Sequence, residues 1–337
     1  MGLLKFLVRR VISIIPVLIG VLVLTFIISR AIVPDPARVW AGPRADQATL
    51  RSIAEEYHMY DPLYIQFWYY VRDLAQGNWG LSPSSGQPVL MLIVTYFPAT
   101  LELSIVAMAI AIGLGILVGV AGAVKHNTWP DGLSRLLTMF GVATPPFLIA
   151  LIIQLVFFYY LGVFPDSGGR ISVFVNDPLH ITGMFILDSL ITGNWPAFWS
   201  SLQHIIMPAF SLAFIYFGIF SRITRAAMLE VLGMDYIRTA RSKGLIERVV
   251  IFKHALRNAL IPTTTVVTVM FAYMLGGSIV VESIFDWPGI GRYAAQSIVE
   301  LDFPAVMGVT LIFAICVVIA NLLADILYTL LDPRIVV

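Results

Sequence analysis

The sequence predicts an all-α integral membrane protein with six membrane-spanning helices, and composition is the first reason. Of the 337 residues, 59% are apolar and only 12% are charged, whereas soluble domains average about 45–50% apolar and about 25% charged residues. The mean hydropathy is +0.88. The second reason is a series of uncharged runs of about 20 residues, the length that crosses the hydrocarbon core as a helix. A soluble globule is excluded, because it would lack the polar residues needed to cover its surface.

Six uncharged runs come near this length, provided that the third helix starts after the pair Pro145-Pro146. Proline suits the first turn of a helix, where its missing N–H leaves no hydrogen bond unmade. The expected spans are residues 11–28, 103–124, 147–164, 205–220 (continuing past Arg222), 262–281 and 303–324. The first is expected to be an uncleaved anchor, because its apolar run exceeds the roughly 7–15 residues of a secretory signal and no A-x-A site follows.

Charge places both ends of the chain in the cytoplasm. Lys5, Arg9 and Arg10 precede the first span, and eight more basic residues lie in residues 222–261. Since basic residues near span ends favour the cytoplasmic side, the loops 125–135 and 222–261 are expected inside. The overall balance of 21 Lys and Arg against 20 Asp and Glu argues against a protein that binds nucleic acid.

The segments between the spans give the expected domain division. Residues 1–30 carry the first span, residues 31–97 form an extracytoplasmic insert, and residues 98–337 form a core with five spans and the cytoplasmic loop 222–261. The insert has turn residues at Pro34-Asp35-Pro36 and helical patterning around 50–57 and 63–74. Its many aromatic residues suit a cap at the depth of the lipid headgroups and equally a docking surface for an extracytoplasmic partner. The outer segment 162–203 is expected to be irregular, with a helix near 195–202.

The cytoplasmic loop between the fourth and fifth spans has the clearest pattern outside the membrane. Leu245, Val249, Phe252 and Leu256 recur at spacings of four, three and four, which is one stripe of a helix. Glycines interrupt the loop, Gly244 among them, so short helices joined at glycines are expected. A basic amphipathic helix can lie on the anionic inner leaflet or dock into a groove of a cytoplasmic partner. The residues alone favour the leaflet.

Motifs of enzymes and of ion-driven carriers are missing from the sequence. It contains no G-x-x-x-x-G-K-[ST], H-E-x-x-H or G-x-S-x-G motif, and Cys316 is its single cysteine. No catalytic or metal-binding residue is therefore assigned, and an enzyme is not expected. Glu102, Glu282 and Asp325 lie within a turn of span ends, where we expect water to reach them. They predict no proton relay, which disfavours a carrier driven by protons or sodium.

Several blocks of residues, in order along the chain, resemble one known family. They are FPATLEL at 97–103, TPPF at 144–147, DYIRTARSKGL at 235–245, HALRNALIP at 254–262, ESIFDWPGIG at 282–291, DILY at 325–328 and LDPR at 331–334. Together they resemble permeases of the dipeptide/oligopeptide branch of binding-protein-dependent ABC importers. The N-terminal helix and the long first outer loop resemble the first, B-type, of the two permeases in such importers.

This resemblance implies a fold, a set of partners and a cargo. The fold would be that of a type I ABC importer (MetI-like) permease in the cell membrane, with a long first extracytoplasmic loop. The partners would be a second, C-type permease subunit, two ABC ATPase subunits that bind ATP and Mg, and an extracytoplasmic substrate-binding protein. The chain itself would bind no cofactor. The implied cargo is di- or oligopeptides, with oligosaccharides or nickel as alternatives for the same machinery, and an ATP-independent carrier or channel as the alternative of another class.

The resemblance also implies that the cytoplasmic loop is the EAA region, whose short coupling helix sits in a cleft of the ATPase. This reverses the preference for the leaflet. Here Arg238-Thr239-Ala240 stands in the place of the E-A-A triplet and Gly244 in that of its glycine. Arginine thus replaces glutamate, and Pro262 lies eighteen residues past the glycine, further than in the shorter general form. The implied coupling residues are Arg238, Thr239, Ala240, Lys243, Gly244, Leu245, Glu247, Val249 and Phe252.

A substrate pathway is expected along the third to fifth spans. Tyr216 and Phe220, four residues apart, and Met270 and Tyr273, three apart, are the candidates to line it, since adaptable apolar walls suit varied substrates. Ordinary helix packing or contact with lipid is the alternative interpretation of these four side chains.

Overall fold

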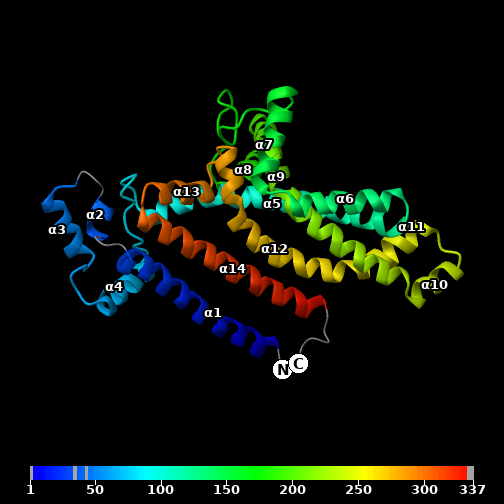
Figure 1. The fold of residues 1–337 in the computed structure, drawn as a ribbon, viewed down its shortest axis with the longest axis horizontal. Helices are drawn as coiled ribbons and strands as arrows, with labels where there is room; N and C mark the ends of the chain where they lie inside the picture. The colour runs from blue at the N-terminus through cyan, green and yellow to red at the C-terminus, as the bar shows by residue number, and fades with distance from the viewer. Residues whose placement is uncertain (1–2, 33–35, 42–44, 332–337) are drawn as a thin grey trace. The chain divides into compact units, whose positions relative to one another are not determined.

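The computed structural model of the chain describes residues 3–32, 36–41 and 45–331, which form helices and their connections. Among these residues there is no β-strand, only one isolated bridge between Leu81 and Pro88, so the all-α prediction is confirmed (Figure 1). They divide into two compact units, which we describe separately. The first contains the described part of Met1–Thr100 together with Pro288–Ile319, and the second is built mainly from Leu101–Trp287.

The helices follow one another with few long connections. The first unit contains α1 (Leu3–Ile27), the π-helical η1 (Ile28–Ile32), α2 (Pro36–Ala41), α3 (Gln47–Glu56), α4 (Leu63–Ala75), the start of α5 (Val89–Val124), α13 (Ile290–Val299) and the start of α14 (Phe303–Leu331). The second contains the rest of α5, α6 (Trp129–Ala143), α7 (Pro146–Ile153), the π-helical η2 (Gln154–Tyr160), α8 (Phe185–Thr192), α9 (Trp195–Leu232), α10 (Asp235–Ser242), α11 (Glu247–Val249), the π-helical η3 (Val250–Ala255) and α12 (Leu256–Ile284).

Four helices are long and apolar enough to cross a membrane, and two bent pairs raise the number to six if each pair is one span. The four are Ile12–Arg30, Val89–Val124, Trp195–Leu232 and Phe303–Ala324. The bent pairs are Trp129–Ala143 with Pro146–Tyr160, at 108°, and Glu247–Thr264 with Val266–Gly276, at 44°. The expected number of six is reached when each bent pair is counted as one span, but the third span then begins at Trp129 and the fifth at Glu247, earlier than expected. The sharp bend falls at Pro145-Pro146, where prolines cannot continue the hydrogen bonds of the preceding helix.

Several helix boundaries differ from those expected. α5 begins at Val89, not at residue 103, and runs through Pro98. α9 is continuous from Trp195, so the helix expected near 195–202 is its first part, and α12 begins at Leu256, before residue 262. The helix expected at 147–164 ends at Tyr160. Charge-free runs mark where a chain meets hydrocarbon, whereas a helix continues past a charged residue that has a partner in the protein.

The two helices expected in residues 31–97 are confirmed as α3 and α4. Asp46 caps α3 by accepting a hydrogen bond from the backbone N–H of Thr49 at 2.8 Å. Of the expected turn, Pro34 and Asp35 lie outside the described residues, and Pro36 begins α2. The tail block at 331–334 lies outside them except for Leu331.

Close packing of α5 against α9 holds the second unit together. A Cβ added at Gly119 would lie 2.7 Å from the backbone oxygen of Ser221, and one at Gly115 would lie 2.6 Å from Cβ of Phe220. A Cβ at Gly113 would meet nothing within 4 Å. Glycines at such contacts let helices in membranes approach more closely than larger residues allow.

Candidate functional site

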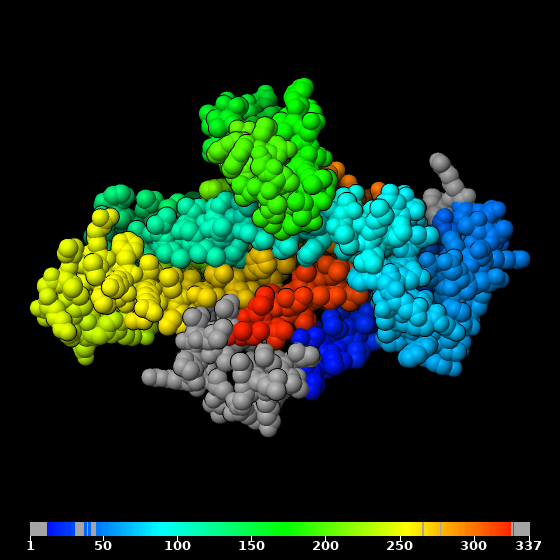
Figure 2. Space-filling model, turned by 180° about the vertical axis from the view of Figure 1, so that it is seen from behind, coloured from blue at the N-terminus to red at the C-terminus, as the bar shows by residue number. Residues whose placement is uncertain are grey.

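The coupling residues implied by the resemblance lie on one segment, residues 235–255, which consists of α10, the turn at Gly244, α11 and η3. This segment lies at one end of the second unit, beside α6 (Figure 1). Figure 2 shows the same residues, in yellow-green to yellow, on the surface of that end. We call it the 235–255 segment.

The inner face of the 235–255 segment belongs to a closed apolar core. Ile237 and Val250 are fully buried there. The core joins the segment to the ends of α5, α9 and α12 through Val120, Ala123, Met228, Val231, Ile237, Ala240, Val250, Ile251, Ala255 and Ala259. A segment seated in this way moves with the helices that it contacts, since packed cores do not deform continuously.

The outer face of the segment carries most of the implied coupling residues. Eight of the nine are exposed: Arg238, Thr239, Lys243, Gly244, Leu245, Glu247, Val249 and Phe252. Ala240 is buried. Phe252, at 53% exposure, and Leu245, at 40%, present apolar surface beside these polar groups. The face thus offers both charge and apolar contact to whatever covers it.

The expected stripe of Leu245, Val249, Phe252 and Leu256 is not one face of an α-helix. Residues 250–255 are π-helical, with a wider turn than the 3.6 residues on which the stripe was counted. As a result Leu256 packs against the inner core, while the first three residues stay exposed. Phe252 also lines an apolar groove with Ile116, Leu117, Val120, Ala121, Val124, Lys125 and Ile251.

Gly244 sets the turn between α10 and α11. Its φ of +75° lies in the left-handed region that glycine adopts at least cost, and the expectation of short helices joined at this glycine is confirmed. Across the turn, Arg241 donates to Glu247 through Nη2 at 2.7 Å and Nε at 3.2 Å. This hydrogen bonding raises the pKa of Arg241. Both side chains are about half exposed, so we expect the pair to fix the geometry of the turn more than the stability of the fold.

Two basic residues near this end have structural roles that the sequence analysis missed. The buried carboxylate of Asp131, on α6, accepts hydrogen bonds from Arg225 of α9 at 2.7 and 3.0 Å. It also pairs with Arg135 and accepts from the backbone N–H of Asn127 at 3.0 Å. The spacing of Asp131 and Arg135, four residues on one helix, was a local signal for part of this cluster.

The segment 162–203, which is expected on the outer side, is held against α5 by a buried ion pair. Arg170 donates to Glu102 at 2.5 Å, and the backbone N–H of Ile186 donates to the same carboxylate at 2.6 Å. The Arg170 guanidinium lies 3.9 Å from the centre of the Phe185 ring. Glu102 is only 4% exposed and Glu282 fully buried, so the expectation that water reaches them is wrong. The side chain of Asp325 lies outside the described residues.

Within the segment 162–203, Asp188 accepts the hydrogen bonds of a turn. Its carboxylate accepts hydrogen bonds from the Thr182 hydroxyl at 2.7 Å and from the backbone N–H groups of residues 181, 182 and 183. Burial alone would raise the pKa of Asp188, but these hydrogen bonds hold it below its ordinary value.

The four candidate pathway residues fall into two environments. Tyr216 and Phe220 are buried in the second unit, Phe220 against Gly115 of α5. Tyr273 is 65% exposed and Met270 is partly buried. The four therefore do not form one continuous wall within this chain. In the part of the chain that the structure describes, no group of three or more His, Cys, Asp or Glu could hold a metal ion.

Comparison with known proteins gives matches over nearly the whole chain. Residues 111–337 match the family model described as the binding-protein-dependent transport system inner membrane component, and residues 3–104 match the model of its N-terminal part. The probable D,D-dipeptide transport system permease protein DdpB of Escherichia coli is 44% identical over 95% of this chain and 94% of its own. The dipeptide transport system permease protein DppB of Alkalihalophilus pseudofirmus is 40% identical over 97% and 98%. The glutathione transport system permease protein GsiC of E. coli is 36% identical over 98% and 99%.

Proposed function

This chain belongs to the family of inner membrane components of binding-protein-dependent transport systems, and on that premise we propose that it forms part of an import pathway for peptides. It is a multi-pass membrane protein and a non-catalytic permease subunit of an ABC importer. Such a permease works with an ATPase and with a substrate-binding protein. The names of the relatives support the cargo: one carries D,D-dipeptides, one dipeptides and one glutathione, and all three are short peptides. Oligosaccharides, nickel and ATP-independent transport find no support among them.

The assembly that we propose contains four further chains. A second, C-type permease completes the pathway, two ABC ATPase subunits bind ATP and Mg, and a binding protein delivers the peptide on the outer side. This chain binds no cofactor of its own. Both of its termini and the 235–255 segment face the cytoplasm, as the distribution of basic residues suggests.

The 235–255 segment is the proposed contact with the ATPase. Support comes from its two faces: the inner face is fixed in the core of the second unit, and the outer face presents Arg238, Lys243 and Phe252. The segment also continues into α12 without an interruption, since η3 ends at Ala255 and α12 begins at Leu256. A movement of the ATPase can therefore pass directly into α9 and α12.

Coupling of this kind requires that the ATPase contact the segment differently in its two states, since binding alone shifts no equilibrium. When ATP closes the ATPase dimer, the segment moves as a rigid lever. The helices then exchange an inward-open cavity for an outward-open one. Met270 and Tyr273 are the pathway candidates that remain accessible, whereas buried Tyr216 and Phe220 support the helices behind them.

Site-directed crosslinking tests both the contact and the orientation. In a Cys316→Ser background, Phe252→Cys and Phe174→Cys place a thiol at two exposed phenylalanines, at 53% and 94% exposure. We expect Phe252→Cys to crosslink to the ATPase subunit and Phe174→Cys to react with a membrane-impermeant reagent from outside. Labelling of both from the outside, or no ATPase crosslink at any stage of the cycle, would contradict the proposed contact.

Uptake in proteoliposomes tests the function. The reconstituted complex should import a labelled dipeptide only with ATP and the binding protein. Gly244→Asp should abolish uptake and stimulated ATP turnover while the chain remains inserted, because it places a negative charge on the exposed turn of the proposed ATPase contact. Uptake by this chain alone, or normal uptake by the variant, would refute the scheme.

A further inference from the structure

The first unit contains an open cavity whose described charged lining is entirely basic. It lies among η1, α2, α3 and the start of α4, and has a volume of about 540 Å³, within the usual range of ligand sites. Eleven described residues line it: Arg30, Ala37, Arg38, Gln47, Leu50, Arg51, Ala54, Met59, Tyr60, Leu63 and Gln66. None of these eleven is Asp or Glu. We call it the arginine cavity.

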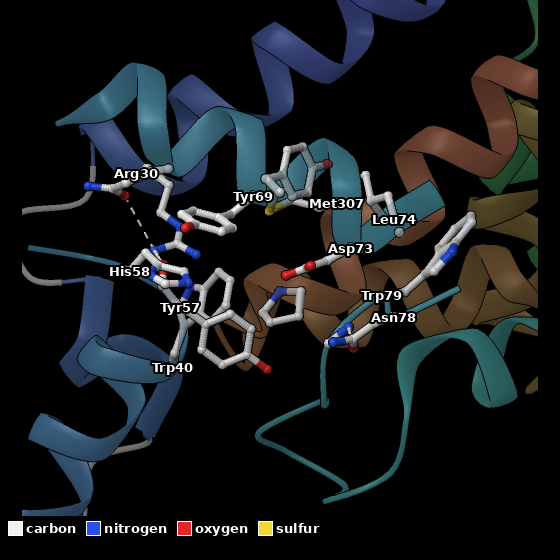
Figure 3. Close-up of a pocket in the computed structure, with 15 residues that line it drawn as sticks. Arg30, Trp40, Tyr57, His58, Tyr69, Asp73, Leu74, Asn78, Trp79 and Met307 are labelled. Atoms are coloured by element: carbon white, nitrogen blue, oxygen red, sulfur yellow. Dashed lines mark hydrogen bonds between the residues drawn. The ribbon is translucent and has the colours of Figure 1, made fainter. Parts of the chain in front are cut away.

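Aromatic rings and hydrogen bonds hold Arg30 in the arginine cavity. Its guanidinium carbon lies 4.4 Å from the centre of the Trp40 ring and 5.8 Å from that of Tyr57. Nη1 donates to the Tyr57 carbonyl at 3.4 Å and to Oε1 of Gln66 at 3.5 Å. Figure 3 shows the guanidinium among the rings of Trp40, Tyr57 and Tyr69.

Gln66 holds Arg30 in this position. Its side chain is 93% buried, and its Nε2 donates to the carbonyls of Met59 at 3.1 Å and Asp61 at 2.8 Å. Both amide protons are thereby used, so Oε1 is fixed toward the guanidinium. The hydrogen bonds of Gln66 thus orient Arg30, which lines the cavity.

The described residues supply no carboxylate partner for this charge. Arg30 forms no ion pair among them, and neither does Arg51 of α3, which is exposed at the same cavity. The nearby Asp73, which lines the aromatic pocket of Figure 3 on the other side of Arg30, is paired with Arg72 at 2.9 Å. A partly buried guanidinium that no carboxylate of the described residues pairs with is costly, and an anion in the cavity would offset that cost.

The position of Arg30 along its helix indicates where such an anion comes from. Arg30 is the last residue of the first candidate span, Ile12–Arg30, so we expect its head at the depth of the lipid headgroups. Arginine at a span end reaches toward the headgroup layer, where lipid phosphates are the anions within its reach. The guanidinium fork also matches phosphate oxygens two at a time.

We propose that the arginine cavity binds the phosphate of an anionic phospholipid headgroup, with Arg30 and Arg51 as its cationic ligands. Free inorganic phosphate has the same chemistry, and the experiment below separates the two sources. This binding does not depend on transport, so it can be measured on the purified full-length chain.

The experiment compares lipid retention by the full chain in nanodiscs of phosphatidylcholine that contain a small fraction of labelled phosphatidylglycerol. The variants are Arg51→Gln, Arg30→Gln and, as the matched control, Arg72→Gln. Arg72 is an exposed arginine of the same unit, paired with Asp73 and absent from the described lining of the cavity. Arg51 is exposed, so its replacement leaves the fold intact.

We expect phosphatidylglycerol to bind the native chain about tenfold more tightly than it binds Arg51→Gln or Arg30→Gln. Arg72→Gln should match the native chain, and high salt should weaken the preference. Equal retention by all four proteins would overturn the proposal. Displacement of the labelled lipid by millimolar inorganic phosphate would assign the cavity to a soluble anion and overturn the lipid assignment.

Discussion

Replacing Gly119 by alanine should loosen the packing of α5 against α9. The new Cβ would lie 2.7 Å from the Ser221 backbone oxygen and 2.9 Å from Cβ of Thr224. These neighbours are backbone and a β-branched side chain, so neither can rotate away. The two helices must instead separate by several tenths of an ångström along a contact that is otherwise close-packed.

The size of this effect follows from the cost of overpacking a core. Forcing an extra methyl group into such a contact costs about 1–3 kcal/mol. For a chain of this size, each kcal/mol lowers the melting temperature by roughly 2–4 °C. We therefore expect Gly119→Ala to melt roughly 2–12 °C below the native chain.

Gly113→Ala, on the same helix, is the matched control, because its Cβ would meet nothing within 4 Å. Alanine there should be neutral or slightly stabilising, since it favours the helix by up to about 1 kcal/mol over glycine. The assay is thermal unfolding of purified protein in detergent, followed by the fraction that remains monodisperse after heating. Equal melting of the two variants would refute the reasoning from close approach.

Three other predictions concern Glu102, Asp188 and Gly244. Glu102→Gln should destabilise the chain by about 3–5 kcal/mol because it leaves the Arg170 charge buried alone, and adding Arg170→Met should recover most of that loss in the same thermal assay. Hydrogen bonds hold the pKa of Asp188 low, so its stabilisation is present above about pH 4 and is lost as the pH falls further. The protection factor of the Thr182 amide against hydrogen exchange should accordingly fall below that pH, whereas in Asp188→Asn it should be low already at neutral pH. At Gly244, asparagine tolerates a positive φ and valine does not, so Gly244→Asn should keep more stimulated ATP turnover than Gly244→Val.

The sequence predicts the spans well where hydrocarbon alone decides the structure. The run 303–324 coincides with a candidate span of the structure, because nothing charged interrupts it. The sequence predicts the start of α5 poorly. Glu102 ends the uncharged run, but in the folded chain the charge of Glu102 is neutralised by Arg170. The two residues are 68 positions apart, and no local pattern connects them.

The same limit applies to the candidate site. The proposed coupling residues follow from the resemblance and the turn at Gly244 from the glycine itself, and eight of the nine residues are exposed in the structure. The Asp131–Arg225 contact joins residues 94 positions apart, so it depends on the packing of α6 against α9. The counting of apolar spacings assumed α-helical turns and could not anticipate the π-helical turns of η3.

Because its turns are wide, η3 contains more residues than an α-helix would need to span the same number of turns. A π-helical turn holds about one residue more than an α-helical turn, so deleting one residue within Val250–Ala255 can be absorbed by relaxing η3 to ordinary helix. The same deletion later in α12 would rotate everything beyond it by about 100° and misalign its packing with α9. Changes in length between related chains should therefore collect at η3, where geometry tolerates them, and be rare along the rest of that helix.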